Sequence, residues 1–145
     1  MTHTPRVLHL VDDTTAGGVM RVIEYLTSSE VLARGADHQV LSVRRGRFGQ
    51  LPKGFDVIVS HTVISWRTRP ALIALRASRA GIPLIHVEHS YTEGFVSHNV
   101  ARKRRFKSLL RIAFSLFDRV VAVSHAQAAW IKKNQLCPED QLVAI

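Results

Sequence analysis

The stretch from Arg6 to Leu26, RVLHLVDDTTAGGVMRVIEYL, most constrains the fold of this 145-residue chain. It opens with an apolar run, Val7 to Val11, that is typical of a buried strand. Two acids and a turn of small residues follow, and after Gly17 and Gly18 apolar residues recur at i, i+3, i+4 and i+7, which predicts a helix. A strand, a glycine turn and a helix in this order form the first unit of a parallel α/β sheet.

The turn that contains Gly17 and Gly18 is a candidate ligand site, because ligands of such sheets bind at the carboxyl ends of the strands. Glycine lets the backbone come close to a bound group. Paired glycines are also compatible with a tight turn that binds nothing. Both interpretations stay open at this point.

The alternation of strand and helix continues along the chain. Apolar runs bounded by glycine, proline and polar residues predict strands, and periodic stretches between them predict helices. Six strands with short helical connections indicate an α/β fold, a Rossmann-like doubly wound parallel sheet of about six strands with helices on both faces. The expected later strands are 39–43, 56–60, 83–87, 119–123 and 141–145. The expected helices are 19–34, 70–80, 100–117 and one that begins at Ser124. A basic loop is expected at 44–54 and a mobile loop at 89–99.

Length and composition indicate one globular domain that spans residues 1–145, since 46% hydrophobic and 21% charged residues are ordinary for such a domain. The single cysteine, Cys137, excludes an internal disulfide, and no Cys/His cluster has zinc spacing. The sequence shows no signal peptide and no apolar run long enough to cross a bilayer, so we expect a cytoplasmic protein. Residues Leu142 to Ile145 read as an unfinished buried strand, and we therefore expect a fragment of a longer protein.

Net charge is the unusual bulk property of the chain. Twenty Lys and Arg against eleven Asp and Glu leave a formal charge of +9, which points to an anionic partner: nucleic acid, a membrane surface or a phosphorylated substrate. No acid occurs between Glu93 and Asp118, and the helix expected there is either a solvated face over a core stripe or a docking surface for the inner face of the cell membrane. Its basic residues are Arg102, Lys103, Arg104, Arg105, Lys107 and Arg111.

Several segments follow one another in a recognisable order. A glycine turn, a helix and a strand are expected in GGVMRVIEYLTSSEVLARGADHQVLSV, and two strands that end in histidine follow in FDVIVSHT and PLIHVEHS. A strand, a serine and a helix then occur in FDRVVAVSHAQAAWI, and a last strand is expected in QLVAI. In this order they resemble the N-terminal, acceptor-side domain of family 4 glycosyltransferases, the group 1 enzymes of the GT-B fold. The likeness covers nearly the whole chain. It departs from the family at Glu88, where an apolar or small residue is commoner, and the second Rossmann domain, which holds the nucleotide-sugar, is absent from the sequence.

The resemblance implies a retaining transfer of a sugar from a nucleoside diphosphate sugar to a glycan, lipid-linked or phosphorylated acceptor, without a metal or other cofactor. This domain alone is expected to be inactive. The resemblance implies that Gly17 and Gly18 offer amides to the donor diphosphate or the acceptor, and that His89 is a catalytic residue at the transferring sugar. It also places His61 in the acceptor pocket and Arg21 near an acceptor phosphate.

Each site residue also has a plain structural interpretation. His61 and His89 fit capped loop residues without a chemical role. Ser124 is a candidate for substrate binding, yet Ser124 and Gln127 form an S-x-x-Q capping box that explains the serine without function. A zinc site at His86 and His89 fails, because these two positions of a strand point to opposite faces.

Other classes of protein fit the sequence less well. A nicotinamide-dependent dehydrogenase needs G-x-G-x-x-G in the first turn, and a phospho-receiver domain needs an acceptor Asp after the third strand; the chain has neither. The alternative function is a non-enzymatic domain that binds nucleic acid or an anionic membrane through the basic helix 102–111. Strands that interleave aromatic and basic residues, as expected for single-stranded nucleic acid, are not evident, so no nucleic-acid partner is expected. The oligomeric state stays open.

Overall fold

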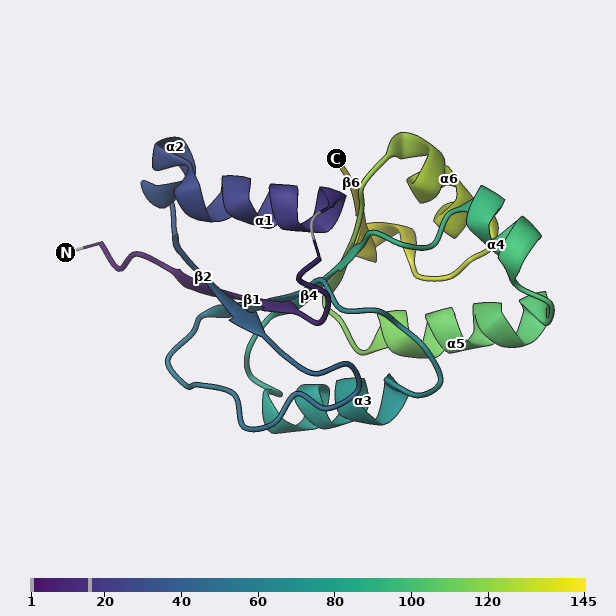
Figure 1. Ribbon diagram of the computed structural model, residues 1–145, viewed down its shortest axis with the longest axis horizontal. Helices are drawn as coiled ribbons and strands as arrows, with labels where there is room; N and C mark the ends of the chain where they lie inside the picture. The colour runs from purple at the N-terminus through teal and green to yellow at the C-terminus, as the bar shows by residue number, and fades with distance from the viewer. Residues whose placement is uncertain (1, 16) are drawn as a thin grey trace.

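The computed structural model describes residues 2–15 and 17–145; Met1 and Ala16, the latter part of the predicted glycine turn, lie outside the described residues. The described strands form one parallel six-stranded sheet in the order β2-β1-β3-β4-β5-β6 (Figure 1). This confirms the predicted α/β, Rossmann-like sheet. The strands are β1 (Arg6–Val11), β2 (Asp37–Ser42), β3 (Val57–Ser60), β4 (Leu84–Glu88), β5 (Arg119–Ala122) and β6 (Leu142–Ala144).

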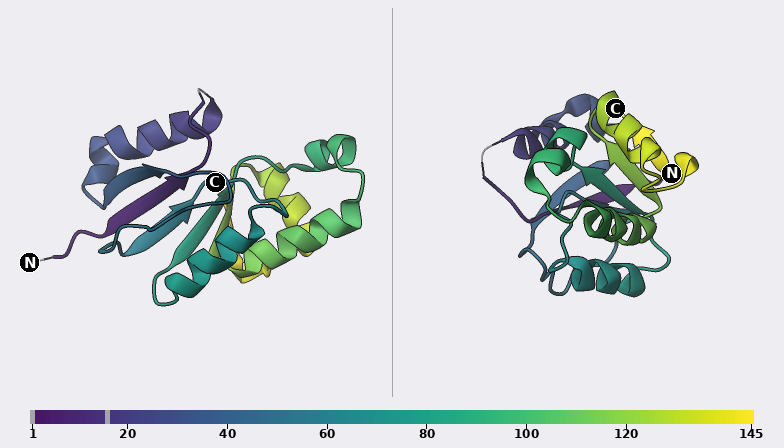
Figure 2. Two further views of the ribbon diagram at one scale, coloured as in Figure 1. Left: turned by 60° about the horizontal axis from the view of Figure 1, so that its bottom comes forward. Right: turned by 90° about the vertical axis from the view of Figure 1, so that its right-hand side faces the viewer.

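Helices cover both faces of the sheet, as a doubly wound fold requires. Figure 2 shows α1 on one side of the sheet and α3 and α5 on the other. The change of side follows from the strand order, because the chain moves from β1 to one edge through β2 and then returns to build the other edge with right-handed connections. The helices are α1 (Gly18–Ser28), α2 (Glu30–Ala33), α3 (Arg69–Ser78), α4 (Glu93–Asn99), α5 (Lys103–Ser115) and α6 (His125–Lys133), with a 3₁₀ turn, η1 (Glu139–Gln141).

Alternate residues of the strands enter two separate apolar clusters. The larger one joins Leu8 and Leu10 of β1 and Val120 of β5 to the buried stripe of α5, which includes Leu110 and Phe114. The smaller one, on the opposite face, is built around Val7, Val59 and Val87. A residue therefore belongs to one face or the other according to its parity in the strand. This parity decides which polar side chains can meet.

Two predicted local features are wrong. The segment 89–99, expected to be a loop, contains α4, which begins after Thr92, whose hydroxyl accepts a hydrogen bond from the Phe95 amide at 3.2 Å. Only Val96 of α4 is buried, so the sequence shows no helical apolar period there. The first helix is also interrupted, because the Ser29 hydroxyl caps the short helix α2.

Candidate functional site

The candidate site lies at the carboxyl edge of the sheet, where β1, β3 and β4 end side by side. Asp12 directly follows β1, and its side chain links two loops of this edge. Its carboxylate accepts a hydrogen bond from the Val63 amide at 3.1 Å and pairs with the Arg45 guanidinium at 3.4 Å. The other carboxylate oxygen, Oδ1, is buried and has no partner among the residues that the structure describes. A buried charge beside the glycine turn thus holds this edge in place.

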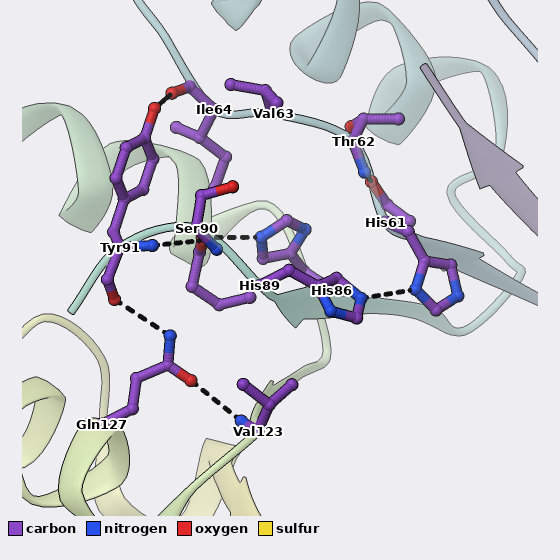
Figure 3. A network of polar contacts seen from close by, with 12 residues as sticks. His61, Thr62, Val63, Ile64, His86, His89, Ser90, Tyr91, Val123 and Gln127 are labelled. Carbon is purple, nitrogen blue, oxygen red and sulfur yellow. Dashed lines mark hydrogen bonds and ion pairs between the residues drawn. The ribbon is translucent and has the colours of Figure 1, made fainter. Parts of the chain in front are cut away.

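His61 and His89, the two histidines expected in the cleft, are in direct contact. The Nδ1 atom of His61 lies 2.9 Å from the Nε2 atom of His89, and the two ring centroids are 5.2 Å apart (Figure 3). His61 is 5% exposed, whereas His89 is half-buried. The topology explains the meeting, since β3 and β4 are adjacent and parallel and both residues directly follow their strands.

Two more histidines, which the sequence analysis did not single out, extend this pair to a row of four. The Nδ1 atom of His9 lies 2.9 Å from His61 Nε2, and His9 Nε2 lies 2.9 Å from His38 Nδ1. His9 is buried in the middle of β1, and His38 is half-exposed on the edge strand β2. The row His38–His9–His61–His89, here called the histidine row, therefore crosses four neighbouring strands.

The strand register produces the histidine row. His38 pairs with Val7, so that His9 lies two residues further toward the carboxyl edge on β1. His9 pairs with Val59, and His61 again lies two residues further on. Ser60 pairs with His86, which places His89 one more such step along β4. Diagonal neighbours two residues apart on one face are within reach of aromatic side chains.

Burial changes the acid–base behaviour of the row. It lowers the pKa of His9 to about 4 and the pKa of His61 to about 3, with a smaller contribution from the neighbouring imidazoles. Burial also lowers the pKa of His89, while the nearby carboxylate of Glu88 opposes this shift. At neutral pH these three rings are therefore uncharged, and each can donate one hydrogen bond and accept another.

Gly17 and Gly18 open the first helix at the same edge. Gly17 is extended, with φ 173°, so its backbone conformation suits any residue. A Cβ atom on Gly18 would meet no described atom within 4 Å, and one on Gly17 would lie 4.0 Å from the Thr15 carbonyl. Neither backbone strain nor crowding by the residues that the structure describes explains these glycines. This weakens the tight-turn interpretation.

Glu88, the departure from the family pattern, shapes the loop after β4. Its buried carboxylate accepts hydrogen bonds from the amides of Ser90 at 2.9 Å and Tyr91 at 3.2 Å, and lies 3.0 Å from His86 Nε2. His86 itself packs between Phe114 and Phe117, on the face opposite to the histidine row, as the strand parity predicted. Glu88 therefore fixes the backbone that follows His89.

Gln127 of α6 holds the same loop from the other side. Its amide oxygen accepts from the Val123 amide at 2.8 Å, and its amide nitrogen donates to the Tyr91 carbonyl at 2.9 Å (Figure 3). Tyr91 in turn donates its hydroxyl to the Ile64 carbonyl. Burial, followed by the charge of Glu88, raises the pKa of Tyr91 to about 12. The loops after β3, β4 and β5 are thus tied into one unit.

Ser124 and Arg21 differ in their surroundings. The Ser124 hydroxyl accepts from the Gln127 amide at 3.1 Å, which confirms the predicted helix cap, although the Gln127 side chain reaches Val123 instead of Ser124. Arg21 lies in the first turn of α1 with an exposed side chain. Substrate contacts by either residue stay a prediction.

The basic residues of α5 are not equivalent. The Arg105 guanidinium lies 5.0 Å from the centre of the Trp66 ring, and Arg111 donates to the carbonyls of Asn134 and Gln135 at the end of α6. Lys107 is half-buried. Arg102, Lys103 and Arg104 remain exposed at the N-terminal end of α5, where the helix dipole disfavours cations.

Within residues 2–15 and 17–145, no group of three or more His, Cys, Asp or Glu side chains is arranged to hold a metal ion. Across the same residues, no helix is both long and apolar enough to span a membrane. A cavity of about 400 Å³ lies between the loop 46–51 and α3, on the face away from the histidine row, and contains none of the predicted site residues.

The parallel sheet, with glycines and histidines at its carboxyl edge, defines a Rossmann-like α/β domain, a class of fold in which ligands bind at this edge. The model of Glycosyltransferase Family 4 matches residues 37–145, which is most of the chain. The chain belongs to this family, and the resemblance found in the sequence is confirmed. Membership implies a transferase that acts on a sugar donor and an acceptor. A comparison with curated proteins gave no match.

Proposed function

We propose that the chain is the acceptor-side domain of a retaining glycosyltransferase, which moves a sugar from a nucleoside diphosphate sugar to a glycan, lipid-linked or phosphorylated acceptor. The observation that carries the proposal is the convergence of Gly17–Gly18, His61 and His89 at one sheet edge, on neighbouring strands of a family 4 domain. Because the fold itself does not require either glycine, their free backbone space fits the approach of a ligand.

Each residue has a definite part in this proposal. The amides that open α1 at Gly18 offer hydrogen bonds and the positive end of the helix dipole to a phosphate of the donor or the acceptor. Arg21, one turn further along α1, adds a cation for an acceptor phosphate. His89 meets the transferring sugar or the acceptor hydroxyl, and His61 lies behind it and supports its ring. No metal and no cofactor besides the sugar donor has a part.

The proposal is tested on the gene product that carries this domain together with its donor domain. Release of nucleoside diphosphate from UDP-, GDP- and ADP-sugars is measured with membrane extracts as the acceptor source. We expect His89→Ala to lower turnover about 10²- to 10⁴-fold, the range for a residue that assists proton transfer. His125→Ala, an exposed histidine at the start of α6, is the control and should keep full turnover. Equal turnover of the two variants would contradict the proposed site.

Gly18→Ala separates the function of the glycine turn from its structure. No described atom obstructs the new Cβ, so the free energy of unfolding should stay the same or rise by about 0.4–1 kcal/mol. A phosphate that approaches the α1 amides would meet that methyl group, and we expect the KM for the donor or acceptor to rise. An unchanged KM for both substrates would show that no ligand approaches this turn.

We also propose that the domain docks on the inner face of the cell membrane through α5. Cations at the N-terminal end of a helix oppose its dipole, and an anionic partner offsets this repulsion. With about 1 kcal/mol per basic residue near an anionic surface, Arg102, Lys103 and Arg104 contribute about 3 kcal/mol, enough for reversible attachment.

Vesicle sedimentation tests the docking surface. Anionic vesicles should retain the protein at low salt and release it at high salt, because salt screens exposed charges. Replacing Arg102, Lys103 and Arg104 by Gln should abolish retention, whereas replacing the exposed Arg34 and Lys53 by Gln should change it little. Equal retention by neutral vesicles would contradict the proposal, and preference for single-stranded oligonucleotides over vesicles would favour a nucleic-acid-binding function instead.

A further inference from the structure

The proton arrangement of the histidine row is restricted by its geometry. Its four rings share three contacts of 2.9 Å, His38 Nδ1–His9 Nε2, His9 Nδ1–His61 Nε2 and His61 Nδ1–His89 Nε2. A neutral imidazole has one N–H donor and one acceptor nitrogen. If each contact is a hydrogen bond, every ring must therefore use the same tautomer as its neighbours. The row is all Nε2–H or all Nδ1–H.

The row has two ends with different surroundings. His38 Nε2, at the edge strand, and His89 Nδ1, at the carboxyl edge, make no hydrogen bond with the residues that the structure describes. In the all-Nε2–H arrangement, His38 has its free N–H at the half-exposed edge of the sheet, where water can accept it. His89 then offers a lone pair at Nδ1. In the all-Nδ1–H arrangement the two ends exchange these properties.

Two physical effects together select the all-Nε2–H arrangement. Free histidine prefers the Nε2–H tautomer in water, and this arrangement gives all four rings that tautomer. Burial, which lowers the pKa of His9 and His61, removes the alternative of a charged ring that donates to both neighbours. Both buried rings are consequently satisfied only as neutral relays that accept through one nitrogen and donate through the other, and the intrinsic preference of histidine then selects donation through Nε2.

We propose that His38, His9 and His61 are positioning residues that hold His89 in its Nε2–H tautomer, so that His89 Nδ1 accepts a hydrogen bond from a substrate hydroxyl. The part of this proposal that concerns the substrate rests on the proposed glycosyltransferase function. The part that concerns the tautomer depends only on the three contacts of the row. His38, three hydrogen bonds away, therefore influences the atom that His89 presents at the site.

Two variants of nearly equal size at His38 test the coupling. In His38→Asn the side-chain oxygen takes the place of Nδ1 and still accepts from His9 Nε2. In His38→Leu a methyl group occupies that place, and the buried His9 N–H loses its acceptor. The Leu variant should therefore favour the reversed arrangement, in which His9 donates through Nδ1 instead, while the Asn variant should behave as the wild-type protein.

The readout is nitrogen-15 NMR of the histidine side chains, which reports the protonated nitrogen of each ring without any substrate. We expect His89 to be protonated at Nε2 in the wild-type protein and in His38→Asn. In His38→Leu the ratio of Nε2–H to Nδ1–H at His89 should fall about fivefold, the factor that corresponds to one net hydrogen bond of about 1 kcal/mol. Amide spectra of both variants check that the fold is intact.

Each result of these NMR measurements either supports or contradicts the proposed tautomer of His89. Wild-type His89 protonated at Nδ1, or identical His89 signals in the Asn and Leu variants, would overturn the proposal. If His38→Leu does not fold, the wild-type tautomer and its retention in His38→Asn still decide the question. A negative transfer assay with the expected NMR result would contradict the proposed function and leave the tautomer assignment standing.

Discussion

Mild acid should destabilise this protein through the histidine row. In the unfolded chain His9 and His61 bind a proton near the ordinary histidine pKa of about 6.5. In the native protein burial lowers these pKa values to about 4 and about 3. Between these limits the unfolded state binds more protons, so the free energy of unfolding falls as the pH is lowered. The stabilisation is complete above pH 6.5 and is lost below it.

The size of the effect follows from these pKa values. At pH 5.5, one unit below the unfolded-state pKa, each residue lowers the free energy of unfolding by about 1.4 kcal/mol, so the pair lowers it by about 3 kcal/mol. This is a large part of the 5–15 kcal/mol that is typical of a domain. The carboxylates of Asp56 and Asp118 titrate below this window, because backbone hydrogen bonds lower their pKa values.

Urea unfolding at pH 7.5, 6.5 and 5.5 measures the effect. His9→Leu removes one of the two histidines whose pKa values are lowered furthest, and we expect the loss of stability between pH 7.5 and 5.5 to shrink by about 1.4 kcal/mol, whatever the absolute stability of the variant. His125→Leu, at an exposed position, should keep the full loss. A wild-type loss under about 1 kcal/mol, or an equal loss in His9→Leu, would refute the argument that buried neutral histidines control acid stability.

Two further predictions concern the loops that surround the site. Gln127→Met leaves the buried Tyr91 carbonyl and the part-buried Val123 N–H without their partners and should lower the free energy of unfolding by about 1–3 kcal/mol in urea, whereas exposed Gln50→Met should stay within about 0.5 kcal/mol of the wild type. A loss under 1 kcal/mol for Gln127→Met would contradict this assignment. Ultraviolet titration should show Tyr91 ionising near pH 12, with stability lost as the pH rises above 10 because the unfolded tyrosine releases its proton first; Tyr91→Phe should remove this late step.

The sequence predicted well what depends on local pattern. Apolar runs such as Val57 to Ser60 mark strands that are buried on both faces, and capping residues such as Ser124 mark where helices begin. Because parallel strands that alternate with helices end at one edge, the residues that follow β3 and β4 could be placed in one candidate site. The resemblance to family 4 glycosyltransferases singled out His61 and His89, and the structure places them in contact.

The sequence could not show the partners that lie across the sheet. His9 and His38 occupy strand interiors, where a lone histidine reads as an isolated polar residue. Their contact depends on the register of β1 against β2 and β3, which is set by packing of the whole sheet. Glu88 is a similar case, since only the folded loop brings the Ser90 and Tyr91 amides to its carboxylate.

The amino-acid sequence alone determined the α/β class, the order of the elements and the edge at which chemistry is expected, because strand and helix periodicity and the handedness of their connections are local properties. Only the tertiary structure decided that four histidines form one hydrogen-bonded row and that two of them resist protonation. Register and burial are properties of all strands together, so no single segment contains them.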